Sequence, residues 1–315
     1  VDVLSAKTQI IDFTLNGIPV PEISVAYLDF GLDLTSLSFS ISNTGKGKLT
    51  YHLIPSQDWI TADPVFGDVT DETDDITVTI DKTGLSDSIY KETIEIISGV
   101  SQDTIYVYLN GLMDIDLNYY KVVTIGTQTW MAENLNTGNM INYPGSEATD
   151  NGMIEKYCYG NNIINCDVYG GLYETWEGLA YDTSEFVQSG YASMIIQGIC
   201  PDGWHVAAES DWQTLYDYFG GKSNSGGALK DIGTIQDGTG LWQDPNTGAT
   251  NESGFTALPG GAIQPVLGGF IEKGLSGLFW RVGGFMFARI DHNTIAITDL
   301  NGGYISGSVR CVKDP

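Results

Sequence analysis

The segment that decides the fold runs from Gly198 to Gly221. It reads Gly-Ile-Cys-Pro-Asp-Gly-Trp-His-Val-Ala-Ala-Glu-Ser-Asp-Trp-Gln-Thr-Leu-Tyr-Asp-Tyr-Phe-Gly-Gly, which predicts a turn followed by one short helix. Apolar side chains recur at the helical spacing i, i+3, i+4 and i+7, and they are Trp212, Leu215, Tyr216 and Phe219. The two closing glycines end the helix, because glycine readily adopts the left-handed conformation of helix C-termini. Glu209 and Asp211 lie in the first turn, where the helix dipole favours negative charge.

Further segments with distinctive motifs flank this one in the chain. In order they are residues 129–135 (Thr-Trp-Met-Ala-Glu-Asn-Leu), 156–159 with Cys166, 169–173 with Trp176, 248–260, 279–280 and 308–314. Together with the central segment they resemble the Fibrobacter succinogenes major paralogous domain, over about residues 115–315. The resemblance implies a secreted module with a C-type-lectin-like fold, in which the last strand pairs with the first, near residues 122–125. It implies little about biochemical activity.

Length and charge bound the remaining possibilities. A chain of 315 residues favours two domains. Residues 1–115 carry 18 acidic and 5 basic side chains and residues 116–315 carry 22 and 9, so each part has a net charge of −13. Such a surface repels nucleic acids and anionic lipids, and we expect neither as a partner. The acidity fits either simple solubility or the binding of divalent cations.

No apolar run approaches the roughly 18–20 residues that cross a bilayer. We therefore expect contact with a membrane only through a lipid anchor outside this sequence. The sequence starts without an initiator Met or a signal peptide, as a mature or trimmed chain would.

The four cysteines lack the CxxC spacing of zinc sites. Cys158 and Cys166 flank a polar loop that a disulfide could close. Cys200 and Cys311 would then join the start of the central helix to the last strand, closing a loop of about 110 residues worth roughly 4–5 kcal/mol. Free buried cysteines are the alternative. If the disulfides form, the protein is extracytoplasmic.

The first 112 residues divide into an N-terminal segment, residues 1–22, and a predicted β-sandwich of immunoglobulin type, residues 23–112. The N-terminal segment is either a linker or an extra edge strand. Short alternating runs predict its strands, at residues 24–30, 37–41, 49–53, 76–80, 93–97 and 104–109. The pattern formed by residues 41–45, 58–60, 64–67, Leu85 and Tyr90 resembles the BACON domain, which often precedes carbohydrate-active or surface modules in gut Bacteroidetes. We expect Trp59 in the core, and the acidic residues 68–75 in a solvated loop or a weak calcium site.

Residues 113–315 form the second, C-type-lectin-like domain of this prediction. The fold class is therefore mainly β, with an α+β second domain. Residues 222–254 are rich in Gly, Asn and Asp and have little periodicity. Such a long irregular loop is usually functional or mobile, and in a C-type-lectin-like fold the ligand site would lie there.

The sequence gives little support for catalysis. Its three histidines, His52, His205 and His292, are not spaced as metal ligands, and we expect His205 in the core at the helix entry. No Gly-x-Ser-x-Gly elbow or phosphate-binding glycine loop is present. The implied fold is related to that of the formylglycine-generating enzymes, which oxidise substrates with cysteines, but all four cysteines here have a structural explanation. We expect no enzyme and no cofactor, with a structural calcium ion left open.

Calcium-dependent sugar binding needs a particular set of ligands. Many C-type lectins hold calcium through Glu-Pro-Asn or Gln-Pro-Asp and through Trp-Asn-Asp. Here Gln264-Pro265-Val266 lacks the acid, and Arg281-Val282 follows Trp280. A different set of oxygen ligands, Asp237, Asp244, Asn246 and Glu252, lies in the long loop and predicts either turns or a calcium site.

Aromatic side chains offer another route to sugar recognition. Trp242 lies in the long loop beside Asp237, Gln243 and Asp244, and is either an exposed platform or part of the core. Trp280 with Arg281 is the second candidate. The arginine marks either a ligand specificity particular to this protein or only a surface charge. Trp130, Trp204 and Trp212 match core positions of the family.

Ala207 and Ala208 stand where the family often has Pro-Ser. The loss of a serine cap costs about 1 kcal/mol, unless Ser210 caps a shorter helix.

We therefore predict a non-catalytic binding or adhesion protein at the cell surface, as an outer-membrane lipoprotein or a secreted protein. It would recognise a glycan or a host or cell-surface ligand through the long loop. The alternatives are a structural surface module that makes protein–protein or subunit contacts and, third, a modifying enzyme.

Overall fold

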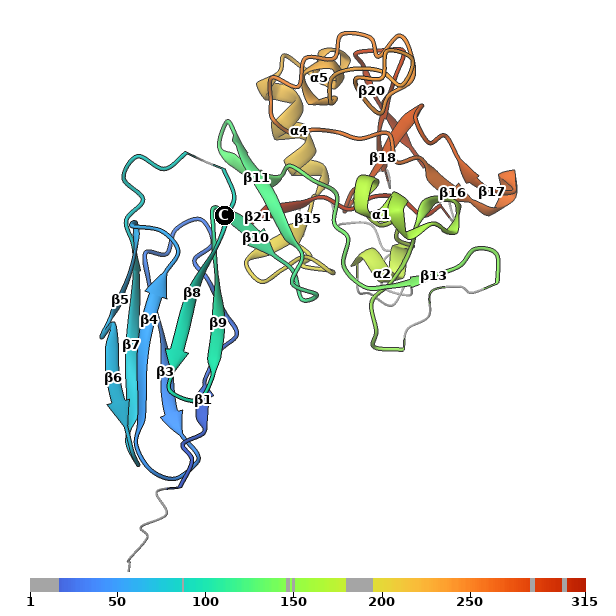
Figure 1. The fold of residues 1–315 in the computed structure, drawn as a ribbon. Coiled ribbons are helices and arrows are strands. Elements are labelled where there is room, and N and C mark those ends of the chain that lie inside the picture. The colour runs from blue at the N-terminus through green and yellow to red at the C-terminus, as the bar shows by residue number, and fades with distance from the viewer. Residues whose placement is uncertain are drawn as a thin grey trace, which may run out of the picture. The chain divides into compact units, whose positions relative to one another are not determined.

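The computed structural model describes residues 17–86, 88–145, 148, 151–179, 195–283, 287–301 and 305–315. The chain divides into two compact units, Val1–Asn110 and Gly111–Pro315 (Figure 1), where the sequence predicted a boundary after residue 112. Most of the predicted N-terminal segment, residues 1–16, lies outside the described residues. Its end is an edge strand, the second of the two alternatives, because Pro21–Ile23 forms β1 at the edge of its sheet and pairs with residues 41–43.

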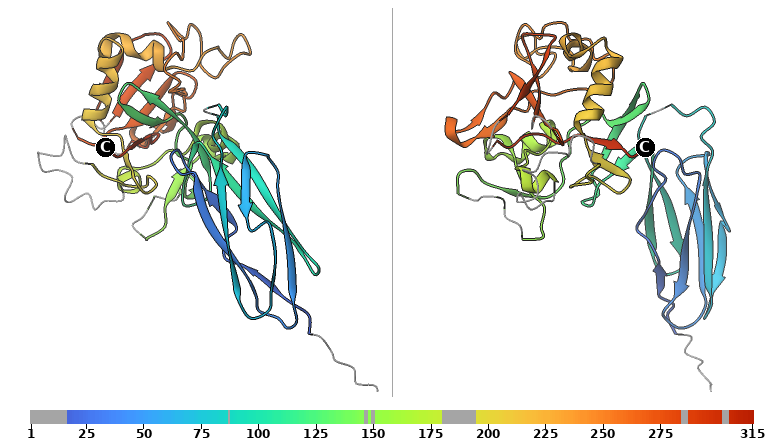
Figure 2. Two further views of the ribbon diagram at one scale, coloured as in Figure 1. Left: turned by 90° about the vertical axis from the view of Figure 1, so that its left-hand side faces the viewer. Right: turned by 180° about the vertical axis from the view of Figure 1, so that it is seen from behind.

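The first unit consists of two facing sheets, as the views in Figures 1 and 2 show. One sheet has the order β1 (Pro21–Ile23), β3 (Ser36–Asn43), β7 (Thr73–Ile80) and β5 (Ile60–Asp63). The other has the order β2 (Tyr27–Asp29), β9 (Gln102–Leu109), β8 (Tyr90–Ser98), β4 (Leu49–Pro55) and β6 (Phe66–Val69). All neighbours are antiparallel except β2 and β9.

The sandwich core follows from the alternation in the sequence. In β4, Leu49, Tyr51 and Leu53 are buried while the residues between them are exposed, because successive strand residues point to opposite faces. Trp59 packs against this core, edge-on to Tyr90 with ring centroids 5.5 Å apart. The acidic residues 68–75 are not mainly a loop, because β6 and β7 together take all but residues 70–72.

The second unit is built on a sheet with the order β10 (Gly111–Met113), β11 (Tyr119–Ile125), β12 (Gln128–Met131), β21 (Cys311–Lys313) and β15 (Trp204–Val206). Its smaller sheets are β13 (Asn139–Ile141) with β14 (Glu155–Tyr157), β16 (Ala262–Gln264) with β17 (Gly269–Ile271), and β18 (Ser276–Trp280) with β19 (Phe287–Asp291) and β20 (Ile297–Leu300). The helices are α1 (Ile163–Tyr169), α2 (Thr175–Leu179), α4 (Glu209–Tyr218) and α5 (Lys222–Leu229), with 3-10 turns η1 (Tyr159–Asn161) and η3 (Pro265–Leu267).

The last strand, β21, returns to the opening hairpin of this unit. Its Val312 lies opposite Trp130 of β12 on one side and His205 of β15 on the other. The resemblance implied that the last strand pairs with residues 122–125 of β11. In the structure β21 pairs with the next strand instead, because β12 lies between β11 and β21.

Helix α4 forms as predicted, and it buries Trp212, Leu215 and Tyr216. Ser210 does not cap it, because the helix already begins at Glu209 after Ala208. Instead the Asp211 carboxylate accepts a hydrogen bond from the Ala208 backbone N–H at 2.8 Å. This hydrogen bond is the half of a capping box that does not involve the N-cap side chain. It offsets part of the stability that is lost with the serine cap.

Both disulfides form as expected, Cys158–Cys166 and Cys200–Cys311, and no cysteine is free. The segment between the first pair is η1 and part of α1 rather than a polar loop. None of the helices in the described ranges is long and apolar enough to span a bilayer.

Removal of the long-range disulfide should destabilise the second unit most. Loop-closure entropy gives about 5 kcal/mol for the Cys200–Cys311 separation of 111 residues and about 2.5 kcal/mol for the Cys158–Cys166 separation of 8. We expect Cys200→Ser/Cys311→Ser to lower the denaturant midpoint more than Cys158→Ser/Cys166→Ser does. Tryptophan fluorescence can follow this unit, because six of the seven tryptophans lie after residue 111. Equal losses would show that chain entropy does not set the order.

Candidate functional site

The predicted aromatic platform in the long loop does not exist. Trp242 is fully buried, and its indole Nε1 donates a hydrogen bond to the Ala257 carbonyl at 3.0 Å. The ring belongs to the same core cluster as Trp130, Trp212 and Phe255. The core interpretation of Trp242 was therefore the correct one, because the loop folds inward over its own aromatic residue.

The second candidate pair is also buried. Trp280 is 1% exposed, packs on Phe287 with centroids 4.2 Å apart, and donates from Nε1 to the Tyr173 carbonyl at 2.8 Å. Arg281 is equally buried and forms ion pairs with Glu209 at 3.0 Å and Asp299 at 2.9 Å. The prediction of a surface charge at 281 is wrong, since the guanidinium joins α4 to β20 inside the unit.

The oxygen ligands proposed for calcium are not gathered around one point. Asp237, Asp244 and Glu252 are exposed, whereas Asn246 is buried and donates from Nδ2 to the carbonyls of Asp231 and Gly233. In the described part of the chain, no group of three or more His, Cys, Asp or Glu side chains is arranged to hold a metal ion. Gln243 is half-buried, with its backbone N–H bound to the Gly274 carbonyl.

A buried lysine holds the long loop together. Lys230 is fully buried, and its ammonium donates to the carbonyls of Thr247 at 2.8 Å, Thr294 at 3.0 Å and Asp291 at 3.1 Å. It also lies 5.7 Å from the centroid of Trp242. Backbone carbonyl oxygens are hard ligands that bind cations well. The Lys230 ammonium therefore provides a positive charge at the place where the long loop meets the turn between β19 and β20.

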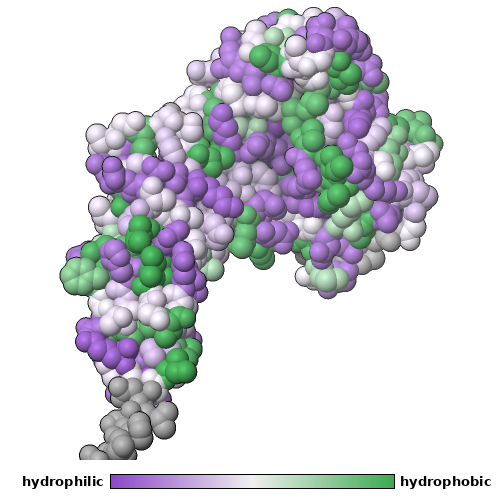
Figure 3. All heavy atoms as spheres, in the orientation of Figure 1, coloured by the Kyte–Doolittle hydropathy of each residue, from purple (hydrophilic) through white to green (hydrophobic). Residues whose placement is uncertain are grey.

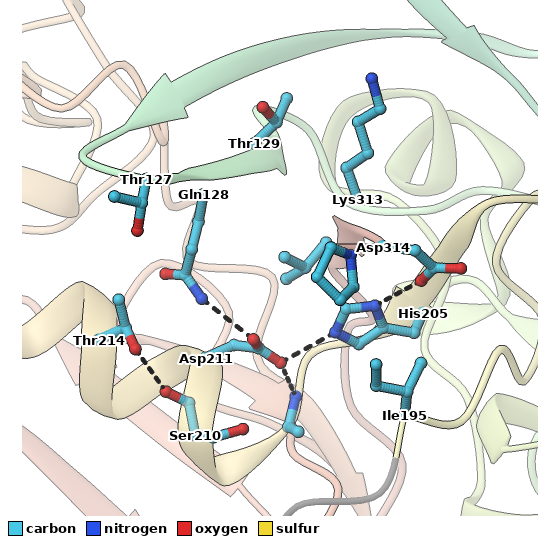
Figure 4. A pocket seen from close by; sticks show the side chains of 13 residues that line it. Thr127, Gln128, Thr129, Ile195, His205, Ser210, Asp211, Thr214, Lys313 and Asp314 are labelled. Carbon is cyan, nitrogen blue, oxygen red and sulfur yellow. Dashed lines mark hydrogen bonds and ion pairs between the residues drawn. The ribbon is translucent and has the colours of Figure 1, made fainter.

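An open cavity of about 610 Å³ lies elsewhere, between the β11–β12 hairpin, α4 and the residues that follow β21 (Figure 4). Its lining is mostly hydroxyl, amide and charged groups: Thr127, Gln128, Thr129, Ser210, Asp211, Thr214, Lys313 and Asp314, with Ile195, His205, Ala208, Val312 and Pro315. Small-molecule sites span roughly 300–1,000 Å³, and the cavity falls in that range.

His205 is the centre of the cavity's electrostatics. Figure 4 shows its ring between two carboxylates, with Nε2 3.0 Å from Asp211 Oδ2 and Nδ1 2.8 Å from Asp314 Oδ1. The other oxygen of Asp211 accepts from Gln128 Nε2 at 3.0 Å. Burial lowers the pKa of His205, but the hydrogen bonds and charges of Asp211 and Asp314 outweigh it and raise this pKa above its usual value.

Both ring nitrogens of His205 lie against carboxylates, so the imidazole orients Asp211 and Asp314. The hydroxyl groups of Thr127, Ser210 and Thr214 also belong to the lining. A hydroxyl can donate one hydrogen bond and accept two, but Thr214 Oγ1 already donates to the Ser210 carbonyl at 2.9 Å. Thr129 Oγ1 lies 3.2 Å from Thr124 Oγ1, on the other face of the hairpin.

Sequence reasoning placed His205 in the core and missed the cavity. The ring is indeed only 3% exposed, but its partners are not core residues. A signal was present in the three-residue spacing of Ala208 and Asp211 at the helix start, which fixes that carboxylate beside β15. Asp314 and Gln128 could not be assigned, because they lie 109 and 77 residues from His205 in the chain.

Two families match the chain, one in each unit. The Fibrobacter succinogenes major domain matches residues 123–313. The viral BACON domain matches residues 21–111. No curated relative matches the sequence.

Parts of the chain are similar to solved structures. A Porphyromonas gingivalis W83 protein of unknown function is 22% identical over 29% of this chain and 46% of its own, with a TM-score of 0.26. The Bacteroides ovatus GH5 xyloglucanase, solved with a XXXG heptasaccharide, is 13% identical over 31% of this chain and 20% of its own, with a TM-score of 0.24. The CsuC–CsuE chaperone–tip adhesion subunit pre-assembly complex of Acinetobacter baumannii is 11% identical over 36% of this chain and 75% of its own, with a TM-score of 0.27. This chain thus spans less than half of the first protein, and TM-scores this low establish no shared function.

Loss of the buried ammonium should destabilise the second unit. In Lys230→Met the stem is kept, but three carbonyls lose their donor, which we expect to cost about 3 kcal/mol of the free energy of unfolding. Denaturant titration followed by tryptophan fluorescence measures this loss. The matched control is Lys121→Met on the exposed side of β11, where the change should be within about 0.5 kcal/mol. A loss at Lys230 no larger than at Lys121 would contradict the role of the ammonium.

His205 should make stability depend on pH. Because its folded pKa is raised, the stabilisation is fully present below the unfolded value of about 6.5 and is lost as the pH rises through the folded pKa. His205→Gln should therefore cost about 2 kcal/mol at acidic pH near 6, and the gap to the unmutated protein should narrow by pH 9. His52→Gln, exposed on β4, is the control. A gap that widens with pH would reverse the assigned sign.

Proposed function

The chain belongs to the Fibrobacter succinogenes major domain family, and we propose that it is a non-catalytic binding protein that recognises a glycan or a cell-surface ligand. The observation that carries the proposal is the cavity beside His205, an open site of about 610 Å³ with mostly polar walls. It replaces the long loop as the place of binding, because the one aromatic residue of that loop, Trp242, is buried. In this proposal the second unit has a C-type-lectin-like fold, supported by the return of β21 to the opening hairpin.

The two disulfides support a location outside the cytoplasm. Disulfides persist in oxidising compartments and are rare where glutathione and thioredoxin keep thiols reduced. The match of the first unit to the BACON domain agrees with this location. We further propose display at the cell surface, through a lipid anchor outside this sequence, or secretion.

The hydrogen bonds that already occupy His205 and Asp211 beside the cavity support binding rather than catalysis. Both nitrogens of His205 hold carboxylates. All four cysteines are paired, so a formylglycine-type oxidation has no thiol to start from. Asp211 is held by three hydrogen bonds, from His205, Gln128 and the Ala208 backbone, which leaves it little freedom as a base.

A structural surface module is the second candidate, and exposed apolar side chains favour it. On α1, Ile163, Ile164 and Val168 are 50%, 62% and 40% exposed, and at η3 Val266 and Leu267 are 79% and 67% exposed. Hydrophobic residues are visible at the surface of this unit in Figure 3. Exposed apolar side chains of this kind suit a protein contact more than a sugar.

Binding of the full chain to arrays of glycans and of extracellular proteins separates the two candidates. Each array is probed with calcium and with EDTA. We expect binding to glycans, unchanged by EDTA, because the hydrogen-bonding side chains of the cavity can hold a sugar directly. Binding only to proteins would favour the structural module, and a signal that EDTA abolishes would return the site to the acidic loop residues. Silence on both arrays would contradict the proposed function.

A further inference from the structure

Tyr218 lies beside two residues that line the cavity, although it is not one of the lining residues itself. It is the last residue of α4 and follows Thr214 by one helical turn. Its ring rests on Gly126 in the β11–β12 turn, next to Thr127, so closely that a Cβ at Gly126 would lie 2.9 Å from Tyr218 Cδ2. Thr127 and Thr214 both line the cavity, at the end away from His205 (Figure 4).

The Tyr218 ring is both exposed and held in place. Its 62% exposure is the highest of any aromatic residue among those described in the second unit. Phe219 meets it edge-on with centroids 4.9 Å apart, and Gly126 supports it from below. An aromatic face that is already fixed in its bound position loses little entropy when a ligand packs on it. The position of Tyr218 therefore fits a binding platform.

Acidic and basic groups are mixed around the cavity. Asp211 and Asp314 face His205, and Lys313 is also among the lining residues. The walls therefore offer no patch of one sign that would select an anion or a cation. The hydroxyls of Thr127, Ser210 and Thr214 add polar groups, of which Thr214 Oγ1 already donates to the Ser210 carbonyl and is left as an acceptor. Such walls fit a neutral ligand that carries many hydroxyl groups.

We propose that the cavity and Tyr218 form one extended site for a neutral oligosaccharide. One sugar unit lies in the cavity, hydrogen-bonded to the threonine and serine hydroxyls, and the adjoining unit stacks its apolar C–H face on the Tyr218 ring. Thr214 and Tyr218 are four residues apart on α4, about 6 Å along the helix axis, which is about the length of one sugar unit. The inference rests on the proposed function, since it names the ligand class and the residues of that same site.

The test uses the full chain and short neutral oligosaccharides, chosen from the glycan array and titrated by calorimetry in EDTA. Tyr218→Ala should weaken binding by about tenfold or more, the order of loss when an aromatic anchor is truncated. Tyr218→Phe keeps the ring and should bind within about twofold, a change of less than 0.5 kcal/mol. Thr127→Val removes one cavity hydroxyl at constant shape and should also weaken binding. The matched control is Tyr106→Ala on β9, which removes a 44% exposed tyrosine from the first unit and should leave binding unchanged.

The outcomes separate the site from the function. If the unmutated chain binds oligosaccharides but Tyr218→Ala and Thr127→Val bind equally well, the site is elsewhere and only the inference fails. If Tyr218→Phe loses as much as Tyr218→Ala, the phenol hydroxyl rather than ring stacking is responsible, and the platform is overturned. If the chain binds proteins and no sugar, the ligand class is wrong while a binding function survives. If it binds neither, both proposals fail.

Discussion

In the second unit, buried lysine and arginine side chains donate hydrogen bonds to backbone carbonyls that are not paired within regular strands. The predicted long loop, residues 222–254, is helical at its start, because α5 takes residues 222–229. From Lys230 to Gly261 the chain forms no named helix or strand, yet much of it is buried, and buried backbone carbonyls need donors. Lys230 supplies three of them, and Arg310 donates to the carbonyls of Met131, Phe255 and Thr256 at 2.7–2.9 Å. Trp242 and Asn246 supply others. Without these donors, an inward-folded loop would pay the desolvation cost of each carbonyl.

Arg310 also connects this loop to the aromatic core. Its guanidinium lies 4.4 Å from the centroid of Phe255 and 5.6 Å from that of Phe279, and its Nε donates to Asn134. Arg310 directly precedes Cys311, which is fixed to Cys200 at the entry to α4. The short segment formed by Arg310 and Cys311 therefore links the central sheet, the entry to α4 and the long loop. Acidic residues dominate the surface while several of the few basic residues are inside, which is consistent with a net charge of −26 on a stably packed chain.

The sequence predicted those parts of the fold that show a regular hydrophobic period or contain paired cysteines. Alternation gave the sandwich strands, since each buried residue such as Leu49 or Leu53 is separated from the next by an exposed one. Helical spacing gave α4, and cysteine spacing gave both disulfides. The long loop has no period, so nothing local distinguished a buried Trp242 from an exposed one. The outcome depended on Ala257 and Lys230, whose positions come from the tertiary fold.

The candidate site could not be read from the sequence for a related reason. Its walls come from β12, α4 and the residues after β21, and no motif spans them. Asp211 shows how one residue joins fold and site: it caps α4 through the Ala208 N–H and orients His205 with the same oxygen, while Gln128 holds the other oxygen. Because the group that starts the helix also shapes the cavity, the site is as rigid as the helix terminus. A site on regular elements is better preorganised than one on a loop, whereas the long loop here packs its own tryptophan inside the unit and does not present it to solvent.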